Sequence, residues 1–195
     1  MADRTLVVGL GNPGDRYAGT RHNAGAMVLA ELAHRAGAKL SAHKSRAAVA
    51  ETRMSPGSPR LVLAQPLSYM NTSGGPVSSL LKYYDLDVDN LVVIHDEIDL
   101  PLGAVKLKRG GGEGGHNGLR DITKALGTKD YVRVRVGVGR PPGRMDTADY
   151  VLKRFSGSES KELPLLISEA ADAVEMLTEK GLIDTQQYFH ARLSS

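Results

Sequence analysis

The sequence has no cysteine among its 195 residues, and aromatic residues make up only 5% of it. The lack of cysteine excludes disulfides, a thiol nucleophile and cysteine-ligated zinc or iron–sulfur sites. Long hydrophobic runs are also missing, because no apolar stretch approaches the ~20 residues that span a bilayer. No long apolar core of the kind found in secretory signals follows the first charged residues. We therefore expect a cytoplasmic protein with no membrane association.

The length and composition are those of a globular protein, with 41% hydrophobic and 24% charged residues. A chain of this size can bury roughly 70% of the surface that its unfolded form exposes, so it needs no disulfide or metal to hold a core. No internal repeat, low-complexity tail or linker interrupts it. We expect a single domain over residues 1–195, most simply a monomer.

Charge and glycine are unevenly distributed along the chain. Residues 104–144 hold ten Lys and Arg against three acidic residues, although the net charge of the whole chain is only +3. Such a segment favours an anionic partner, above all one that bears phosphate, and its alternative is a merely solvated basic face. Many of the 22 glycines fall in residues 9–25 and 110–118, as in loops that approach another group closely.

Apolar runs and helical periods alternate along the chain. Strands are expected at residues 5–9, 49–54, 61–65, 91–94, 103–108 and 132–138, and helices at residues 27–35, 75–84, 119–126 and 158–180. This order predicts the α/β class, as a single-domain three-layer α/β/α sandwich with a mixed, largely parallel twisted sheet. Residues 49–65 should add an antiparallel hairpin around the turn Ser55–Pro59.

Residues Gly9–Gly14 read GLGNPG and satisfy G-x-G-x-x-G directly after a strand. This pattern raises dinucleotide binding as an alternative function. Two features oppose it. The helix should begin at the third glycine, yet helical periodicity resumes only about ten residues later. The expected acid would be Glu31 or a neighbour, which lies inside a predicted helix and not after a second strand.

Several catalytic motifs are missing from the sequence. It contains no G-x-S-x-G elbow, no H-E-x-x-H and no Walker A loop. His95-Asp96-Glu97-Ile98-Asp99 could be read as a metal cluster, but it ends a buried strand, whose alternation cannot aim all four polar groups at one ion. We therefore expect no metal and no cofactor.

Polar side chains gather where the predicted strands end. Asn12, His22, Asn71, Asp96 and the pair His116-Asn117 all fall at such positions. Ligands of α/β sheets bind beyond the carboxyl ends of the strands. A histidine oriented by a carboxylate can take a proton from water, and asparagines can donate hydrogen bonds to a carbonyl or an oxyanion. The pattern favours a shared ligand site, in which a histidine could deprotonate water, over the capping and turn roles that each residue could have alone.

The same residues carry a family resemblance. GLGNPG with Tyr17 and Thr20–Asn23, the block from Pro66 to Asn71, and His95–Pro101 (HDEIDLP) occur in this order. They are followed by Gly110–Gly118 (GGGEGGHNG) and Arg133–Gly139 (RVRVGVG). Together these blocks resemble the bacterial-type peptidyl-tRNA hydrolase, from Leu6 to about Leu152. The resemblance implies a single α/β domain with a mixed sheet. It also implies hydrolysis of the ester between peptide and the 3′ end of tRNA, which recycles tRNA from prematurely released products.

The resemblance also implies a role for each matching residue. His22 would be the general base, Asp96 would orient it, and Asn117 would position the water or the oxyanion. The substrate side would be formed by Asn12, Tyr17, Met70, Asn71 and His116. Lys108 and Arg135 match positions that clamp tRNA phosphate, and Arg144 lies near a further basic position. All three fall inside the basic segment.

Some features fit the resemblance less well. Glu113 places an acid in the second glycine loop, against a direct phosphate contact there. The acidic stretch 158–184 is expected to cover the sheet and not to touch tRNA. His34, His43 and His190 match no expected position. An RNA-binding module without chemistry is a further alternative, but the few aromatic residues form no stacking series on one strand.

Overall fold

The computed structural model describes residues 4–193 and contains one seven-stranded sheet in the order β2-β3-β4-β1-β5-β7-β6. The strands are β1 (Arg4–Gly9), β2 (Ser41–His43), β3 (Ala47–Thr52), β4 (Arg60–Pro66), β5 (Leu91–Glu97), β6 (Val105–Arg109) and β7 (Val132–Gly137). β4, β1, β5 and β7 run parallel in the centre. β3 and β2 extend one side antiparallel, and β6 extends the other. The mixed sheet and the 49–65 hairpin are thereby confirmed.

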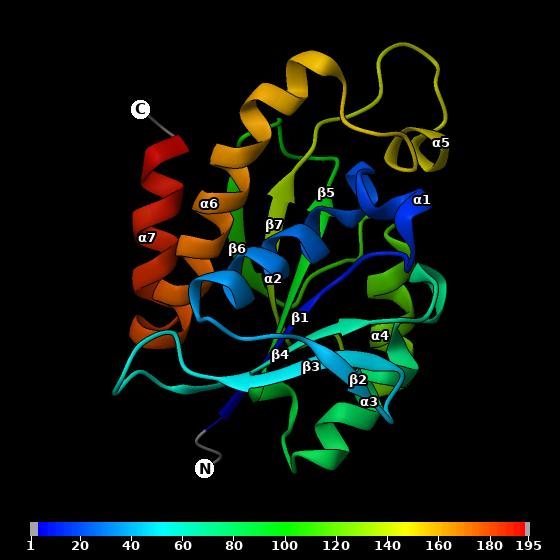
Figure 1. Cartoon of the computed structure of the whole chain (residues 1–195). Helices are drawn as coiled ribbons and strands as arrows, with labels where there is room; N and C mark the ends of the chain where they lie inside the picture. Colours follow the sequence, from blue (N-terminus) through cyan, green and yellow to red (C-terminus); the bar gives the residue numbers. More distant parts are fainter. Residues whose placement is uncertain (1–3, 194–195) are drawn as a thin grey trace.

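Helices cover both faces of this sheet and one edge (Figure 1). The longer helices are α2 (Ala24–Arg35), α3 (Gly74–Tyr83), α4 (Asn117–Leu126), α6 (Gly157–Lys180) and α7 (Leu182–Leu193). The shorter ones are α1 (Asp15–Ala18), α5 (Thr147–Val151) and the 3-10 turns η1 (Arg21–Asn23), η2 (Met70–Thr72) and η3 (Val88–Asn90). α2 and α6 pack on one face, whereas α3 and α4 cover the other. The three-layer α/β/α arrangement is confirmed.

Strand alternation sends neighbouring residues into two separate cores. Val7 of β1 and Ile94 of β5 join the core under α2 and α6. Leu6 and Val8 of β1 join the core under α3 and α4. The acidic helix α6 covers the sheet with its apolar face, as expected.

The first glycine loop serves close packing between chain segments. A Cβ on Gly9 would lie 2.4 Å from the backbone oxygen of Gly25, and a Cβ on Gly25 would lie 2.2 Å from the oxygen of Ile94. These contacts let the start of α2 rest on the ends of β1 and β5. Helix α2 begins only at Ala24, after α1 and η1, so the third glycine opens no long helix. The dinucleotide interpretation loses its structural basis.

Some elements differ from the prediction. β5 continues to Glu97, so Asp96 lies within the strand and not beyond it, because β7 pairs with it as far as Gly137. The elements β2, α1, α5 and α7 were not predicted from the sequence. Helix α7 packs beside the edge strand β6, where Gln186 Nε2 donates to Leu107 O at 2.9 Å and His190 Nε2 accepts from Leu107 N at 3.1 Å. His190 therefore satisfies the backbone of an edge strand.

None of the helices within residues 4–193 is both long and apolar enough to cross a membrane.

Candidate active site

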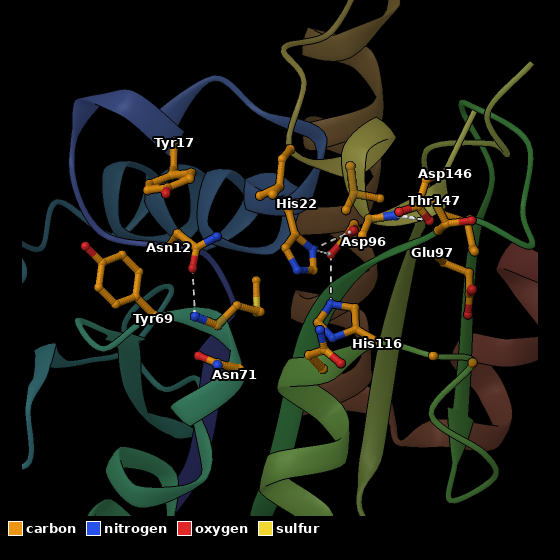
Figure 2. A pocket seen from close by; sticks show the side chains of 18 of the residues that line it. Asn12, Tyr17, His22, Tyr69, Asn71, Asp96, Glu97, His116, Asp146 and Thr147 are labelled. Atoms are coloured by element: carbon orange, nitrogen blue, oxygen red, sulfur yellow. Dashed lines mark hydrogen bonds and ion pairs between the residues drawn. The ribbon is translucent and has the colours of Figure 1, made fainter.

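A cavity of about 760 Å³ lies beyond the carboxyl ends of β1, β4 and β5 (Figure 2). Loops that follow different strands meet here, as expected for an α/β sheet. The cavity is lined by all eight residues predicted to act in catalysis or substrate binding: Asn12, Tyr17, His22, Met70, Asn71, Asp96, His116 and Asn117. These residues are up to 105 positions apart in sequence, and the fold brings them to one place.

His22 and Asp96 form the central contact of the cavity. His22 sits in η1, just before α2, and its Nδ1 lies 3.0 Å from both carboxylate oxygens of Asp96. Both side chains are buried. An ionised carboxylate can only accept a hydrogen bond, so Nδ1 carries the ring proton and donates a hydrogen bond to Asp96. Nε2 is then the ring nitrogen with a lone pair, which is the state that a general base requires.

His116 is a second donor to the same carboxylate. Its Nε2 lies 2.8 Å from Asp96 Oδ1, and its Nδ1 accepts hydrogen bonds from the backbone N–H groups of Gly118 and Leu119. His116 is therefore the N-cap of α4, and this role fixes its neutral tautomer with the proton on Nε2. Asp96 accepts from His22 and His116 together, as Figure 2 shows.

The charge of Asp96 dominates the electrostatics of the site. Burial opposes its ionisation, but the two histidines outweigh burial and hold the pKa of Asp96 well below its usual range. Burial likewise opposes protonation of His22, yet the charge and hydrogen bond of Asp96 raise the pKa of His22 above its ordinary value. Asp96 stays ionised and makes His22 a stronger proton acceptor.

The neighbouring His95 packs against this cluster and is held by a hydrogen bond to the backbone. Its Nδ1 donates to its neighbour's backbone oxygen, Asp96 O, at 2.8 Å, and its ring packs edge-on against His116. Burial, with smaller effects from His116 and Arg133, lowers the pKa of His95 to about 3, so it is neutral. Glu97 and Asp99 bind Arg135 and Arg140 instead. The polar residues of 95–99 therefore diverge, as strand alternation predicts.

His22, Asp96 and His116 have ligand atoms within 4.8 Å of one another, a spacing that a metal ion could use. Their hydrogen bonds fit such an ion poorly. His116 would need a lone pair on Nε2 for the metal while Nδ1 accepts two backbone N–H groups, which requires an imidazolate. The donor set is that of a hydrogen-bonded triad.

Asn12 links two walls of the cavity. Its Oδ1 accepts from Met70 N at 2.7 Å, which leaves the Nδ2 end as the donor that can face a ligand. Its backbone exchanges two hydrogen bonds with the side chain of Asn23, both of 2.9 Å. Asn23 is a site residue to which the sequence analysis gave no role, although it stands in the quoted block Thr20–Asn23.

The comparisons with known proteins agree on one family. The family model described as peptidyl-tRNA hydrolase matches residues 6–195. The chain belongs to the peptidyl-tRNA hydrolase family. A peptidyl-tRNA hydrolase of Pseudarthrobacter chlorophenolicus is 65% identical over 190 residues, with 97% of each chain covered. One of Arthrobacter sp. is 63% identical, with 97% of this chain and 98% of the relative covered.

Solved structures show the same relationship. The crystal structure of peptidyl-tRNA hydrolase from Acinetobacter baumannii matches with a TM-score of 0.88 at 34% identity, covering 98% of this chain and 96% of that one. As a member of the peptidyl-tRNA hydrolase family, this chain is a hydrolase that acts on peptidyl-tRNA. The α/β fold predicted from the sequence is confirmed by this match.

Part of the cavity wall of this peptidyl-tRNA hydrolase family member was not predicted from the sequence. Tyr69 is 60% exposed at its rim and meets Tyr17 edge-on, with the ring centroids 6.3 Å apart. An aromatic residue between Pro66 and Met70, within a block already quoted, was the available signal. A further wall comes from α5 and the residues directly before and after it: Asp146, Thr147, Ala148, Val151 and Leu152.

The three predicted tRNA-binding cations lie outside the cavity lining. Lys108 is on β6 and lies against Gly111, while burial and the guanidinium groups of Arg135 and Arg133 lower the pKa of Lys108. On the adjacent β7, Arg135 donates to Glu97 at 2.9 Å and is only 18% exposed. Arg144 is exposed between β7 and α5.

Proposed function

We propose that the chain hydrolyses the ester between the peptide and the 3′ end of tRNA with a water activated by His22, without a metal or cofactor. The observation that supports this most is the geometry of His22, whose Nδ1 contacts the ionised Asp96 and whose Nε2 is left as a base in the cavity. Orientation by a carboxylate is a recurrent way to activate histidine.

The proposed reaction has two steps. His22 Nε2 takes a proton from water as the water oxygen attacks the ester carbonyl, which forms a tetrahedral intermediate and an imidazolium. Asp96 stabilises this imidazolium through Nδ1–H. The intermediate then collapses, the bond from the carbonyl carbon to the ribose oxygen breaks, and the departing oxygen takes the proton back from His22. The products are the free peptide acid and tRNA.

The other cavity residues hold the reactants. Asn117 positions the water or donates to the oxyanion. The Asn12 donor group and Asn71 hold the peptide and the terminal nucleotide. Met70 and His116 shape the cleft, and Tyr17 lines its substrate side. The role of Asn12 is supported by its hydrogen bond to Met70, since that bond fixes which end of the amide faces the cavity.

We further propose that Lys108, Arg135 and Arg144 contact tRNA phosphates. Lys108 and Arg135 lie on adjacent antiparallel strands, where Lys108 pairs with Arg133 and Arg135 with Lys106. Such a group of cations with few acids would attract a phosphate. Glu97 orients Arg135 through their ion pair.

If Lys108 and Arg135 each neutralise one phosphate, each alanine variant should lose about 0.7–0.9 from the slope of log K against log salt. Lys108→Ala and Arg135→Ala should raise KM more than they lower kcat. Arg135→Ala should have the larger effect, because it also leaves the Glu97 carboxylate unpaired near the phosphate. Binding of peptidyl-tRNA at several salt concentrations measures both slopes.

Two controls accompany this experiment. Lys180→Ala removes an exposed cation at the end of the acidic helix α6 and should leave the salt slope unchanged. A peptide ester on a short 3′ fragment lacks the clamped phosphates, so the Lys108 and Arg135 variants should cleave it at nearly the wild-type rate. Equal losses on fragment and full tRNA would contradict the clamp, as would unchanged salt slopes.

Activity should survive dialysis against EDTA, because the triad is satisfied by hydrogen bonds and His116 has no lone pair to offer a cation. Turnover on peptidyl-tRNA before and after dialysis measures this. A loss of turnover that a divalent metal reverses would contradict the proposed mechanism and point to a metal at His22, Asp96 and His116.

We also propose that residues 1–195 form one domain that acts as a monomer in the cytoplasm, where translation produces the substrate. Mixing the purified protein with peptidyl-tRNA and following ester cleavage tests the function directly. Retention of tRNA without cleavage would indicate a binding module, and turnover that depends on a nicotinamide cofactor would indicate a dehydrogenase. Light scattering on the same preparation tests whether the protein is a monomer in solution.

A further inference from the structure

The wall of the cavity formed by α5 is attached to the turn that bears His22. The chain leaves β7 at Gly137, passes through α5 and reaches the start of α6 at Gly157. Helix α5 contacts η1, although the two elements are far apart in the sequence. The backbone of η1 joins this segment directly, through the bridge between Thr20 and Arg154 and the bond from Arg21 N to Lys153 O at 3.1 Å.

The side chain of Arg21 also connects η1 to α5 and α6. Its Nη1 donates to Tyr150 O at 2.9 Å, and its Nη2 contacts Glu159 Oε1 at 2.5 Å. The guanidinium lies 3.9 Å from the centre of the Tyr150 ring, and the Tyr150 hydroxyl donates to Val138 O at 3.1 Å. One arginine thus holds the turn of His22, helix α5 and the first turn of α6 together.

This arrangement differs from an ordinary surface ion pair. The Arg21 side chain is 8% exposed and that of Glu159 is 16% exposed, so both charged groups are largely desolvated. Glu159 is also fixed by the capping box of α6, in which it accepts from Ser156 N and the Ser156 hydroxyl accepts from Glu159 N. Breaking a buried pair is costly, because the remaining charge loses its partner. The ion pair between Arg21 and Glu159 is therefore expected to be stable.

We propose that Arg21 is a positioning residue that holds the α5 wall of the cavity in register with His22. Arg21 is not among the residues that line the cavity, so it acts through His22 on one side and through Thr147, Ala148 and Val151 on the other. The proposal rests on the proposed function, in that His22 is the base and the cavity holds the ester end of the substrate.

The expected signature is a change in KM. Arg21→Met should raise KM roughly 3–30-fold, as expected for a coupling contact of this kind, with a smaller fall in kcat. The rise should be equal on full peptidyl-tRNA and on a short 3′ fragment, because the α5 wall faces the ester end. The acid limb of the pH profile should stay in place, since Asp96 and His116 still hold His22. Arg21→Lys keeps the charge for Glu159 and should give a smaller rise.

Arg35→Met is the matched control. Arg35 also joins two elements through acids, Glu31 on α2 and Asp172 and Glu175 on α6, but it does not line the cavity or contact α5. It should lower stability without raising KM. Hydrogen exchange of the amides in 147–152 should accelerate in Arg21→Met and not in Arg35→Met.

Three results would overturn the proposal: an unchanged KM in folded Arg21→Lys and Arg21→Met, an equal rise in KM in Arg35→Met, or unchanged exchange in 147–152. If Arg21→Met does not fold, Arg21→Lys and Glu159→Gln carry the same tests, and an unchanged KM in both overturns it. Failure of the proposed function would instead appear as full activity in His22→Ala, while the exchange comparison would still measure the attachment of α5.

Discussion

Replacing His22 with alanine is expected to lower kcat on peptidyl-tRNA by ~10²–10⁴, the usual loss when a positioned base is removed. Among the residues that line the cavity, the other histidine is His116, which cannot replace it. Its Nδ1 caps α4 and its Nε2 donates to Asp96, so it offers no lone pair to water. Initial rates at saturating substrate measure the loss.

Circular dichroism and thermal unfolding must show that His22→Ala is folded. His34→Ala is the matched control, because His34 is exposed on α2, and it should retain wild-type kcat. Near-normal kcat in folded His22→Ala would contradict the assignment of the base.

Asp96→Ala is expected to lower kcat by about 10²-fold, a smaller loss than that of His22→Ala, because the base itself remains. Without the carboxylate, Nδ1 loses its acceptor and the correct tautomer of His22 is no longer enforced. The imidazolium that forms during the reaction also loses its counter-charge. Initial rates of both variants under the same conditions compare them.

The loss in Asp96→Ala has a structural control. His116 loses the same acceptor, so the unfolding of α4 must be checked by hydrogen exchange at Gly118 and Leu119. A larger loss from Asp96→Ala than from His22→Ala in folded proteins would indicate that the carboxylate is the base.

Local patterns predicted much of the fold because they depend on neighbouring residues. The apolar runs of β1 and β5 follow from burial on both faces of the sheet. Helix α7 was missed because its role is tertiary. Its residues Gln186 and His190 act by binding Leu107 of an edge strand that is 79 to 83 positions away.

The candidate site was predicted by residue type and family resemblance, whereas its hydrogen bonds were not. Asp96 was expected at a strand exit near a histidine, but its simultaneous contact with His22 and His116 depends on the order of strands in the sheet. The cap that fixes the tautomer of His116 depends on where α4 begins, which is two residues earlier than predicted.

The positive charge that residues 104–144 present to a partner cannot be obtained by counting residues in the sequence. Of the cations in residues 104–144, Arg135 pairs with Glu97, Arg109 with Asp89 and Arg140 with Asp99. These partners, Asp89, Glu97 and Asp99, lie outside residues 104–144. Arg133 is fully buried, and its Nη1 donates to Gly112 O at 2.6 Å. The positive charge that can meet a phosphate is therefore smaller than the count indicates, because a count within the segment omits acidic partners from other parts of the chain.

The pH dependence of kcat/KM tests the central claim, that His22 is a base held by Asp96. Only neutral His22 can accept a proton, so activity should fall as pH drops through its pKa, which Asp96 raises above the ordinary value for histidine. Asp96→Asn removes the charge that raises this pKa and leaves burial, which lowers it, so the acid limb should move to lower pH. An acid limb at the same pH in both proteins, or no acid limb in the wild type, would contradict the account.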